Sequence, residues 1–132
     1  MIDDTGIFRT TISLSPLTRP GDSITLENVM VDTGAEFSAV PREILEDIGI
    51  PPVAVERFEA ADGRVFEREI GFVLLTAGGR TGPTVVMFAN NDDMTLLGAH
   101  GLEALRLRID LARKELVPAG PAPAAVAVVA AA

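Results

Sequence analysis

The sequence predicts a single, mainly β domain with one or two short helices. Short apolar runs rich in β-branched residues recur along the chain, and Gly- and Pro-containing segments separate them. Only two segments have helical spacing. A chain of 132 residues, 48% of them hydrophobic, suits one core rather than two. We expect the domain to cover residues 1–118, followed by an Ala/Pro/Val-rich tail at 119–132 in which residues 125–129 are a candidate edge strand.

The first third of the chain predicts a hairpin and then a helix. Residues 7–14 and 23–31 read as strands, joined by a loop that contains Pro16 and Pro20. After a second apolar group that ends at Val40, Pro41 suits a first helical position and Gly49 lies just past the expected helix end. The apolar face of this helix would be made by Ile44, Leu45 and Ile48, with Glu43, Glu46 and Asp47 in solvent.

The middle of the chain contains the clearest hairpin signal. Residues 53–66 alternate in polarity on both sides of Asp62-Gly63, a strong two-residue turn signal. The expected tip consists of Ala60, Ala61, Asp62 and Gly63. Taken alone, this pattern fits an ordinary surface hairpin.

The remaining segments alternate between strands and one further helix. We expect strands at 66–76 and 84–89, turned by Gly78-Gly79, and the second of these has the continuous apolar character of a central strand. Residues 90–93 predict a solvated polar loop without the spacing of a calcium loop. Then follow a short apolar segment at 95–98, a helix at 99–105, and strands at 105–109 and 115–117.

Composition excludes several classes of function. The chain has no cysteine, which removes disulfides, thiolate zinc sites and a cysteine nucleophile, and its single histidine, His100, reads as a helix surface residue. A net charge of −8 argues against nucleic acid as a partner. No signal peptide is recognised at the N-terminus, and no apolar run is long enough to span a bilayer. We therefore expect a soluble, cytoplasmic protein with no membrane partner.

One carboxylate stands out by its position. The apolar run 29–31 predicts a strand that stops at Asp32-Thr33-Gly34, between two apolar stretches. Burying a charge there is costly unless it is paired or protonated, so Asp32 either caps its own turn or is a working acid. A second Asp-Thr-Gly, at residues 4–6, follows no strand and reads as an N-terminal turn.

Two motifs in a fixed order carry a resemblance to a known family. Val31-Asp32-Thr33-Gly34-Ala35 is followed, after the hairpin and two strands, by Leu96-Leu97-Gly98 and a helix. Over residues 5–118 this order resembles the retroviral-type aspartic proteases, the retropepsin-like family.

The resemblance implies an all-β fold of the acid-protease type, a closed β-barrel with a flap hairpin, that works as a homodimer. Each subunit would supply one Asp32, and the pair would activate a water against a peptide carbonyl, with no metal and no cofactor. Thr33 would hold the two loops together across the dimer, and Gly34 would let the substrate backbone come close. Substrate contacts would come from Ala35, Glu36 and the flap-tip residues Ala60, Ala61, Asp62 and Gly63.

The chain departs from the viral pattern at an ion pair. Retroviral members carry Asp two positions after the Gly of the first motif and Arg just after the Gly of the second, and here those positions hold Glu36 and Ala99. Glu36 either contacts substrate termini or is solvated.

Three functions are compatible with this reading. The first is an active homodimeric aspartic endopeptidase acting on peptide or protein substrates. The second is a catalytically silent dimeric domain of the same fold that binds extended peptides by strand addition. The third, a carboxylate metalloenzyme, has little support because no ligand cluster accompanies Asp32 in the sequence.

Overall fold

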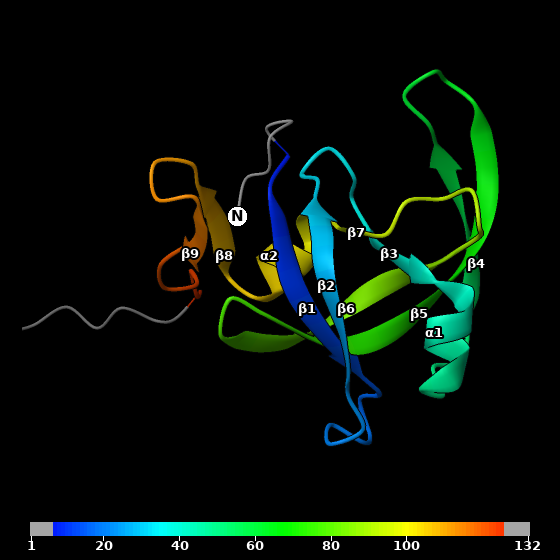
Figure 1. Ribbon diagram of the computed structural model, residues 1–132, viewed down its shortest axis with the longest axis horizontal. Helices are drawn as coiled ribbons and strands as arrows, with labels where there is room; N and C mark the ends of the chain where they lie inside the picture. Colours follow the sequence, from blue (N-terminus) through cyan, green and yellow to red (C-terminus); the bar gives the residue numbers. More distant parts are fainter. Residues whose placement is uncertain (1–6, 126–132) are drawn as a thin grey trace, which may run out of the picture.

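The computed structural model describes residues 7–125, and this part of the chain is mainly β, as predicted. It contains nine strands and two short helices (Figure 1). In chain order these are β1 (Arg9–Ser15), β2 (Ile24–Val31), β3 (Ser38–Pro41), α1 (Arg42–Asp47), β4 (Ala54–Glu59), β5 (Val65–Ala77), β6 (Arg80–Ala89), β7 (Leu96–Leu97), α2 (Ala99–Ala104), β8 (Leu107–Asp110) and β9 (Glu115–Pro118).

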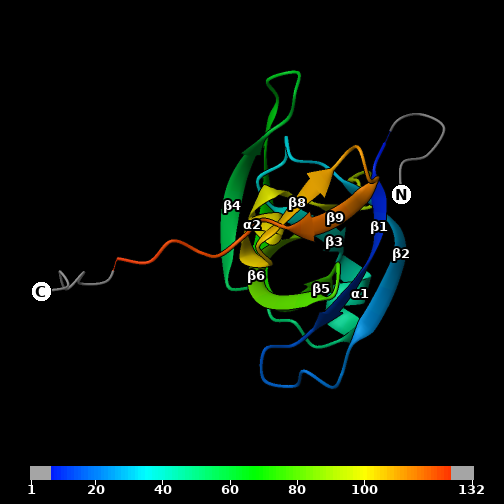
Figure 2. The same ribbon diagram turned by 90° about the vertical axis from the view of Figure 1, so that its left-hand side faces the viewer.

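Seven of the strands form one sheet in the order β1-β2-β7-β3-β6-β5-β4. The predicted hairpin of the first two strands is confirmed, because β1 and β2 pair antiparallel. Strand β1 also pairs with β5 through residues 13–15. The pairings β1-β2-β7-β3-β6-β5 therefore form a closed ring of six strands. Strands β8 and β9 form a separate two-stranded sheet beside α2, and in Figure 2 this small sheet faces the viewer.

The core lies between these strands and is built from aliphatic residues and a few Phe. In β1, Ile12 and Leu14 are buried while Thr11 is exposed, which is the alternation expected of a strand with one face in the core. Strand β6 is buried on both faces from residue 86 to 89 and lies between β3 and β5, which confirms the predicted central strand. The largest side chains that are almost completely buried are Phe88, Ile12, Leu14, Leu45, Leu75, Leu97 and Leu105.

The segment before α1 differs from the prediction. Residues 38–41 form β3, which pairs parallel with β6, and Pro41 is the last strand residue and helix cap rather than the first helical residue. Proline lacks an N–H and is tolerated at a strand end, so the strand stops where the helix begins. The helix itself has the predicted faces: Leu45 is fully buried, and the acidic side chains Glu43, Glu46 and Asp47 are exposed.

Strand β2 is irregular in its middle. The register between β1 and β2 shifts between the pairs Thr10–Val29 and Ile12–Leu26, which leaves one extra residue on β2. Asn28 has a positive φ of 56° at this bulge. On its other edge β2 pairs only with the two-residue strand β7, through Met30 and Val31. Residues 24–29 therefore have no strand neighbour on that side within the described chain.

The β4–β5 hairpin is confirmed, but its turn is longer than predicted. The last strand pair is Glu59–Val65, so five residues, 60–64, form the connection instead of two. We call these five residues the hairpin tip. The Ala60 N–H donates to the Arg64 carbonyl at 2.8 Å, and the Gly63 N–H donates to the Ala60 carbonyl at 2.9 Å. The Asp62 carboxylate accepts the Arg64 N–H at 3.0 Å, which stabilises the wider loop.

The loop at residues 90–93 is only partly the solvated loop that the sequence predicted. Residues 90–92 are exposed, but the Asp93 side chain is only 15% exposed. Its two carboxylate oxygens accept hydrogen bonds from Nε and Nη2 of Arg68 on β5, at 2.7 and 3.0 Å. The Asn90 N–H donates to the same carboxylate at 2.7 Å. Asp93 therefore ties this loop to the β4–β5 hairpin.

Two predictions fall wholly or mainly outside the described residues. These are the N-terminal turn at residues 4–6 and the candidate edge strand at 125–129, of which only Ala125 is described, exposed and outside any strand. Strand β9 ends at Pro118, and Arg106 donates through Nη2 to the carbonyls of Gly120 and Pro121. Among residues 7–125, neither helix has the length and apolar character that crossing a bilayer requires.

The Arg68–Asp93 pair predicts a pH-dependent part of the stability. The hydrogen bond from Arg68 lowers the pKa of Asp93 below its ordinary value, against the opposing effect of burial. A lowered pKa stabilises the fold above the unfolded carboxyl value of about 4, and this contribution is lost as the pH falls through the folded value. We expect Asp93→Asn to reduce the free energy of unfolding by about 2 kcal/mol near pH 7, because hydrogen bonds between charged groups are lost.

Denaturant unfolding at several pH values measures this effect. The difference between wild type and Asp93→Asn should persist at mildly acidic pH and shrink only below about pH 4. Asp22→Asn is the control, since Asp22 also pairs with an arginine, Arg19, but its side chain is 67% exposed. A stability difference for Asp93→Asn that does not change with pH would contradict the assignment.

Candidate active site

Asp32 directly follows β2, at the point where β7 joins it. Val31 is the register partner of Leu97, and the Asp32 N–H donates to the Leu97 carbonyl at 2.9 Å. The Asp32 residue is half-buried. The sheet thus fixes the backbone of Asp32 while its side chain remains within reach of solvent.

The turn that follows, residues 32–35, is held by the Asp32 carboxylate itself. Oδ1 accepts the Gly34 N–H at 2.9 Å, and the Asp32 carbonyl accepts the Ala35 N–H at 3.2 Å. A Cβ on Gly34 would lie 3.1 Å from this carboxylate oxygen, so glycine suits the close approach. The other oxygen, Oδ2, has no hydrogen-bond partner among residues 7–125. The turn-capping interpretation of Asp32 is therefore confirmed for Oδ1, and this does not conflict with a chemical role for Oδ2, which stays a prediction.

The second motif lies directly against this turn, although 66 positions separate Asp32 from Gly98. The Ala99 N–H donates to the Ala35 carbonyl at 2.8 Å, and the His100 N–H donates to the Glu36 carbonyl at 2.9 Å. These N–H groups belong to the first two residues of α2 and have no hydrogen-bond partner within the helix, so the loop carbonyls accept their hydrogen bonds. We call the contact between residues 32–38 and 97–100 the turn clamp.

Two small residues make the turn clamp possible. A Cβ on Gly98 would lie 2.6 Å from the Phe37 carbonyl oxygen and 2.9 Å from that of Ala35, too close for any side chain. The Gly98 N–H donates to the Ser38 hydroxyl oxygen at 3.0 Å, and Ser38 is 2% exposed. Ser38 was not among the residues predicted for the site. Its signal was a single hydroxyl in an otherwise apolar run between Phe37 and Val40.

The predicted site residues fall into two groups. Asp32, Thr33, Gly34, Ala35 and Glu36 lie in one continuous loop, in which Thr33, Gly34 and Glu36 are exposed. Ala60, Ala61, Asp62 and Gly63 lie in the hairpin tip, and all but Ala60 are exposed. Both loops project from the same end of the molecule, at the top of Figure 1 and of Figure 2. The roles assigned to these residues from the sequence remain predictions.

An aromatic cluster that was not predicted from the sequence connects the two groups. The ring centroid of Phe37 lies 5.4 Å from that of Phe58 on β4 and 5.3 Å from that of His100 on α2. Phe58 also stacks on Phe66 of β5 at 5.8 Å. His100 is half-buried against Phe37, so it is not simply a surface residue. These residues are far apart in the sequence, so no local pattern indicated the contact.

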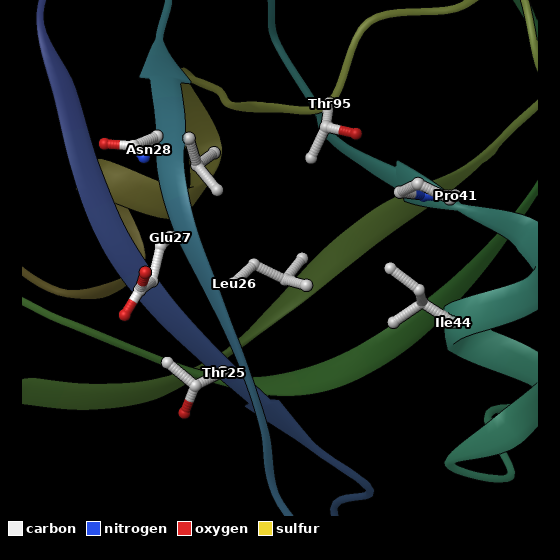
Figure 3. Close-up of a pocket in the computed structure, with 8 residues that line it drawn as sticks. Thr25, Leu26, Glu27, Asn28, Pro41, Ile44 and Thr95 are labelled. Atoms are coloured by element: carbon white, nitrogen blue, oxygen red, sulfur yellow. The ribbon is translucent and has the colours of Figure 1, made fainter.

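A hollow on the surface of the single chain lies away from Asp32. It has a volume of about 490 Å³ and lies between β2, β3, α1 and Thr95 (Figure 3). Its walls are Thr25, Leu26, Glu27, Asn28, Val29, Pro41, Ile44 and Thr95, and none of these is a predicted site residue. The hollow follows from the short β7, which leaves the edge of β2 open before Met30.

The described residues do not form a metal-binding group of side chains. Within residues 7–125, no three side chains of His, Cys, Asp or Glu are grouped so that they would hold a metal ion.

The turn clamp predicts that Gly98 does not tolerate a side chain. In Gly98→Ala the new methyl group would meet two backbone carbonyl oxygens, which cannot move without displacing the Asp32 turn. We expect the free energy of unfolding to fall by about 1–3 kcal/mol, as in other overpacked sites. Gly21→Ala is the control, because a methyl group there would meet no atom within 4 Å, and it should be nearly neutral. Thermal or denaturant unfolding that shows equal stability for the two variants would contradict the packing.

Comparison with known proteins identifies the family. A family model described as "Aspartyl protease" matches residues 21–100, which are 80 of the 132 residues. A matching solved structure is the solution structure of the simian foamy virus (mac) protease, with 18% identity and a TM-score of 0.49, covering 72% of this chain and 91% of that chain. No curated protein matches the chain. Because the family model spans more than half of the sequence and includes both the Asp32 turn and Gly98, the chain belongs to the aspartyl protease family.

Proposed function

We propose that the protein is a retropepsin-like aspartic endopeptidase that hydrolyses peptide bonds as a homodimer. The observation that carries this proposal is the Asp32 side chain, in which Oδ1 caps its turn and Oδ2 has no partner in the described chain. Family membership adds to it, since the matched region includes this turn.

Amide hydrolysis requires two acid–base groups, and a single chain supplies only one Asp32. Hydrolysis of an amide needs a base to take a proton from water and an acid to give one to the carbonyl oxygen. Asp32 is the carboxylate that the turn clamp holds, and one chain supplies one copy of it. Two like carboxylates in contact share one proton and titrate as a pair, which is the established behaviour of aspartic proteases. Two copies of Asp32 across a two-fold axis would divide the roles.

The reaction then proceeds in balanced steps. The ionised carboxylate takes a proton from a water as the water oxygen attacks the carbonyl carbon, and the protonated carboxyl gives its proton to the carbonyl oxygen. The C–N bond then breaks as the first carboxyl gives its new proton to the amide nitrogen and the second carboxylate takes a hydroxyl proton from the intermediate. The products are an acid and an amine, and the pair again holds one proton. The turn clamp supports this mechanism because it holds both ends of the Asp32 turn, through the Asp32 N–H to Leu97 and the Ala99 N–H to Ala35.

The other predicted residues fit around this centre. Thr33 is exposed on the turn, as a residue that bonds across a dimer must be, and Gly34 leaves room for a substrate backbone. Ala35 and Glu36 of the Asp32 loop would contact the substrate from one side. The hairpin tip would cover it from the other side through Ala60, Ala61, Asp62 and Gly63. The ring of strand pairings through β1 and β5 supports the closed barrel expected of such a domain.

In the proposed homodimer, the substrate cleft lies where the two Asp32 turns meet. Such a cleft would take an extended peptide or protein segment, and a catalytically silent domain of the same fold would use it only to bind peptides.

Peptide cleavage at mildly acidic pH tests the proposal. Wild type should cleave members of a peptide library, and Asp32→Asn should lower kcat/KM by at least about 100-fold because a general acid–base group is lost. Asp47→Asn is the matched control, since it removes an exposed carboxylate on α1 by the same chemical change and should leave activity unchanged. A pepstatin-type inhibitor should block cleavage and a chelator should not. Peptide binding without cleavage by wild type would favour the silent domain, and undiminished cleavage by Asp32→Asn would overturn the assignment.

The proposed dimer predicts a pH-dependent assembly. If two Asp32 carboxylates share a proton only in the dimer, association takes up a proton that separated chains release. The dimer should therefore weaken as the pH rises towards and through neutral, and Asp32→Asn should remove part of this dependence. Sedimentation at several pH values measures the dissociation constant. Equal pH slopes for wild type and Asp32→Asn would count against a shared proton.

A further inference from the structure

The β4–β5 hairpin presents two different faces. Directly paired residues lie on the same face of a hairpin, so Phe58–Phe66 and Glu56–Arg68 share one face and Arg57–Glu67 and Val55–Glu69 share the other. The face with the aromatic pair packs against the small cluster of Ala39, Met87 and Ala89. We call it the inner face. The last inward contacts before the hairpin tip are thus those of Phe58, Phe66 and Arg68.

All three nitrogens of the Arg68 guanidinium donate hydrogen bonds, and the group also stacks on an aromatic ring. Its Nε and Nη2 donate to both oxygens of Asp93, and its Nη1 donates to the Glu67 carbonyl at 2.8 Å. Its Cζ lies 4.6 Å from the ring centroid of Phe66. Arg68 is 19% exposed, and Arg68–Asp93 is the ion pair with the least exposed partners among the described residues. One guanidinium therefore contacts both the loop after β6 and the aromatic cluster.

These contacts continue to the Asp32 turn. Phe66 stacks on Phe58, and Phe58 meets Phe37 edge to face. Phe37 belongs to the turn clamp, where its carbonyl lies against Gly98. On its other side Arg68 is fixed by Asp93, whose carboxylate also accepts the Asn90 N–H. The path from Asp93 to Phe37 consists of direct contacts, with a charged anchor at one end and the turn at the other.

We propose that Arg68 is a positioning residue that sets where the hairpin tip lies relative to the Asp32 turn. The tip begins about four residues from Arg68, which is about 14 Å along a strand, so a small rotation at Arg68 becomes a large displacement at the tip. Loss of this anchor would leave Phe58 and Phe66 as the remaining inward contacts near the tip. The consequence for catalysis rests on the proposed function, whereas the consequence for the position of the tip does not.

The geometry requires arginine rather than any cation. A planar guanidinium bonds both oxygens of a carboxylate and stacks on a ring at once, whereas an ammonium is a point charge with neither property. Arg68→Lys keeps the charge and most of the volume but loses the two-point bond and the stacking. It is therefore a conservative variant that is expected to fold.

A matched control lies at the next position of the same strand. Glu69 is on the opposite face and pairs with Arg42 of α1 at 2.9 Å, and its side chain is 38% exposed. Glu69→Gln removes an ion pair that joins β5 to another element, but that ion pair has no contact with the aromatic cluster. It should leave the hairpin tip unchanged.

Amide hydrogen exchange tests the position of the tip without any substrate. In Arg68→Lys the amides of residues 59–65 should exchange about tenfold faster than in wild type, as expected for the loss of one charge-assisted bond, while β6 amides at 85–88 stay unchanged. Glu69→Gln should match wild type in both regions. Unchanged exchange at 59–65 in Arg68→Lys, or equal acceleration in β6, would overturn the proposal.

Kinetics then tests the link to catalysis. With a peptide that wild type cleaves, Arg68→Lys should raise KM several-fold with little change in kcat, because the tip contributes to binding of ground and transition states alike. A fall in kcat at unchanged KM would overturn the positioning role. If wild type cleaves no peptide, the proposed function fails, and the exchange result alone decides whether Arg68 positions the tip.

Discussion

The turn clamp is the contact on which the rest of the site depends. Strand β7 is only two residues long, yet it lies between β2 and β3 and brings Gly98 against the loop that follows Asp32. Three backbone hydrogen bonds, from Asp32, Ala99 and His100, join segments that are distant in the sequence. A side chain at Gly98 would prevent this approach, so one glycine determines whether the carboxylate is held by the sheet or only by its own turn.

The two loops of the site are held in different ways. The Asp32 turn is fixed by backbone hydrogen bonds and by the half-buried packing around Phe37. The hairpin tip is exposed and depends on contacts made several residues earlier, at Phe58, Phe66 and Arg68. In the proposed peptidase, a rigid Asp32 turn and a hairpin tip that depends on a remote anchor would suit a site that admits an extended substrate and then encloses it.

Much of the fold could be predicted because local patterns were strong. The alternation in β1, the continuous apolar run of β6 and the faces of α1 each appear in a few adjacent residues. The strand at residues 38–41 was missed because Pro41 reads as a helix start and the run is too short to show alternation. The hairpin turn was predicted too short because Asp62-Gly63 is also compatible with a wider loop in which the Asp62 carboxylate accepts the Arg64 N–H.

The site could be predicted only in part, because Ser38, Phe37 and Arg68 act through contacts that connect distant segments. Asp93 looked like one of several loop carboxylates, and a single sequence contains no local sign that Arg68 reaches it.

The bulge at Asn28 has a further effect on how the chain meets other chains. An edge strand with free N–H and C=O groups is a template on which other strands assemble without control. The open side of β2 is such an edge from residue 24 to 29, but the extra residue breaks its regular spacing and Glu27 adds a charge beside it. Uncontrolled edge-to-edge pairing with the strands of other chains is thereby disfavoured.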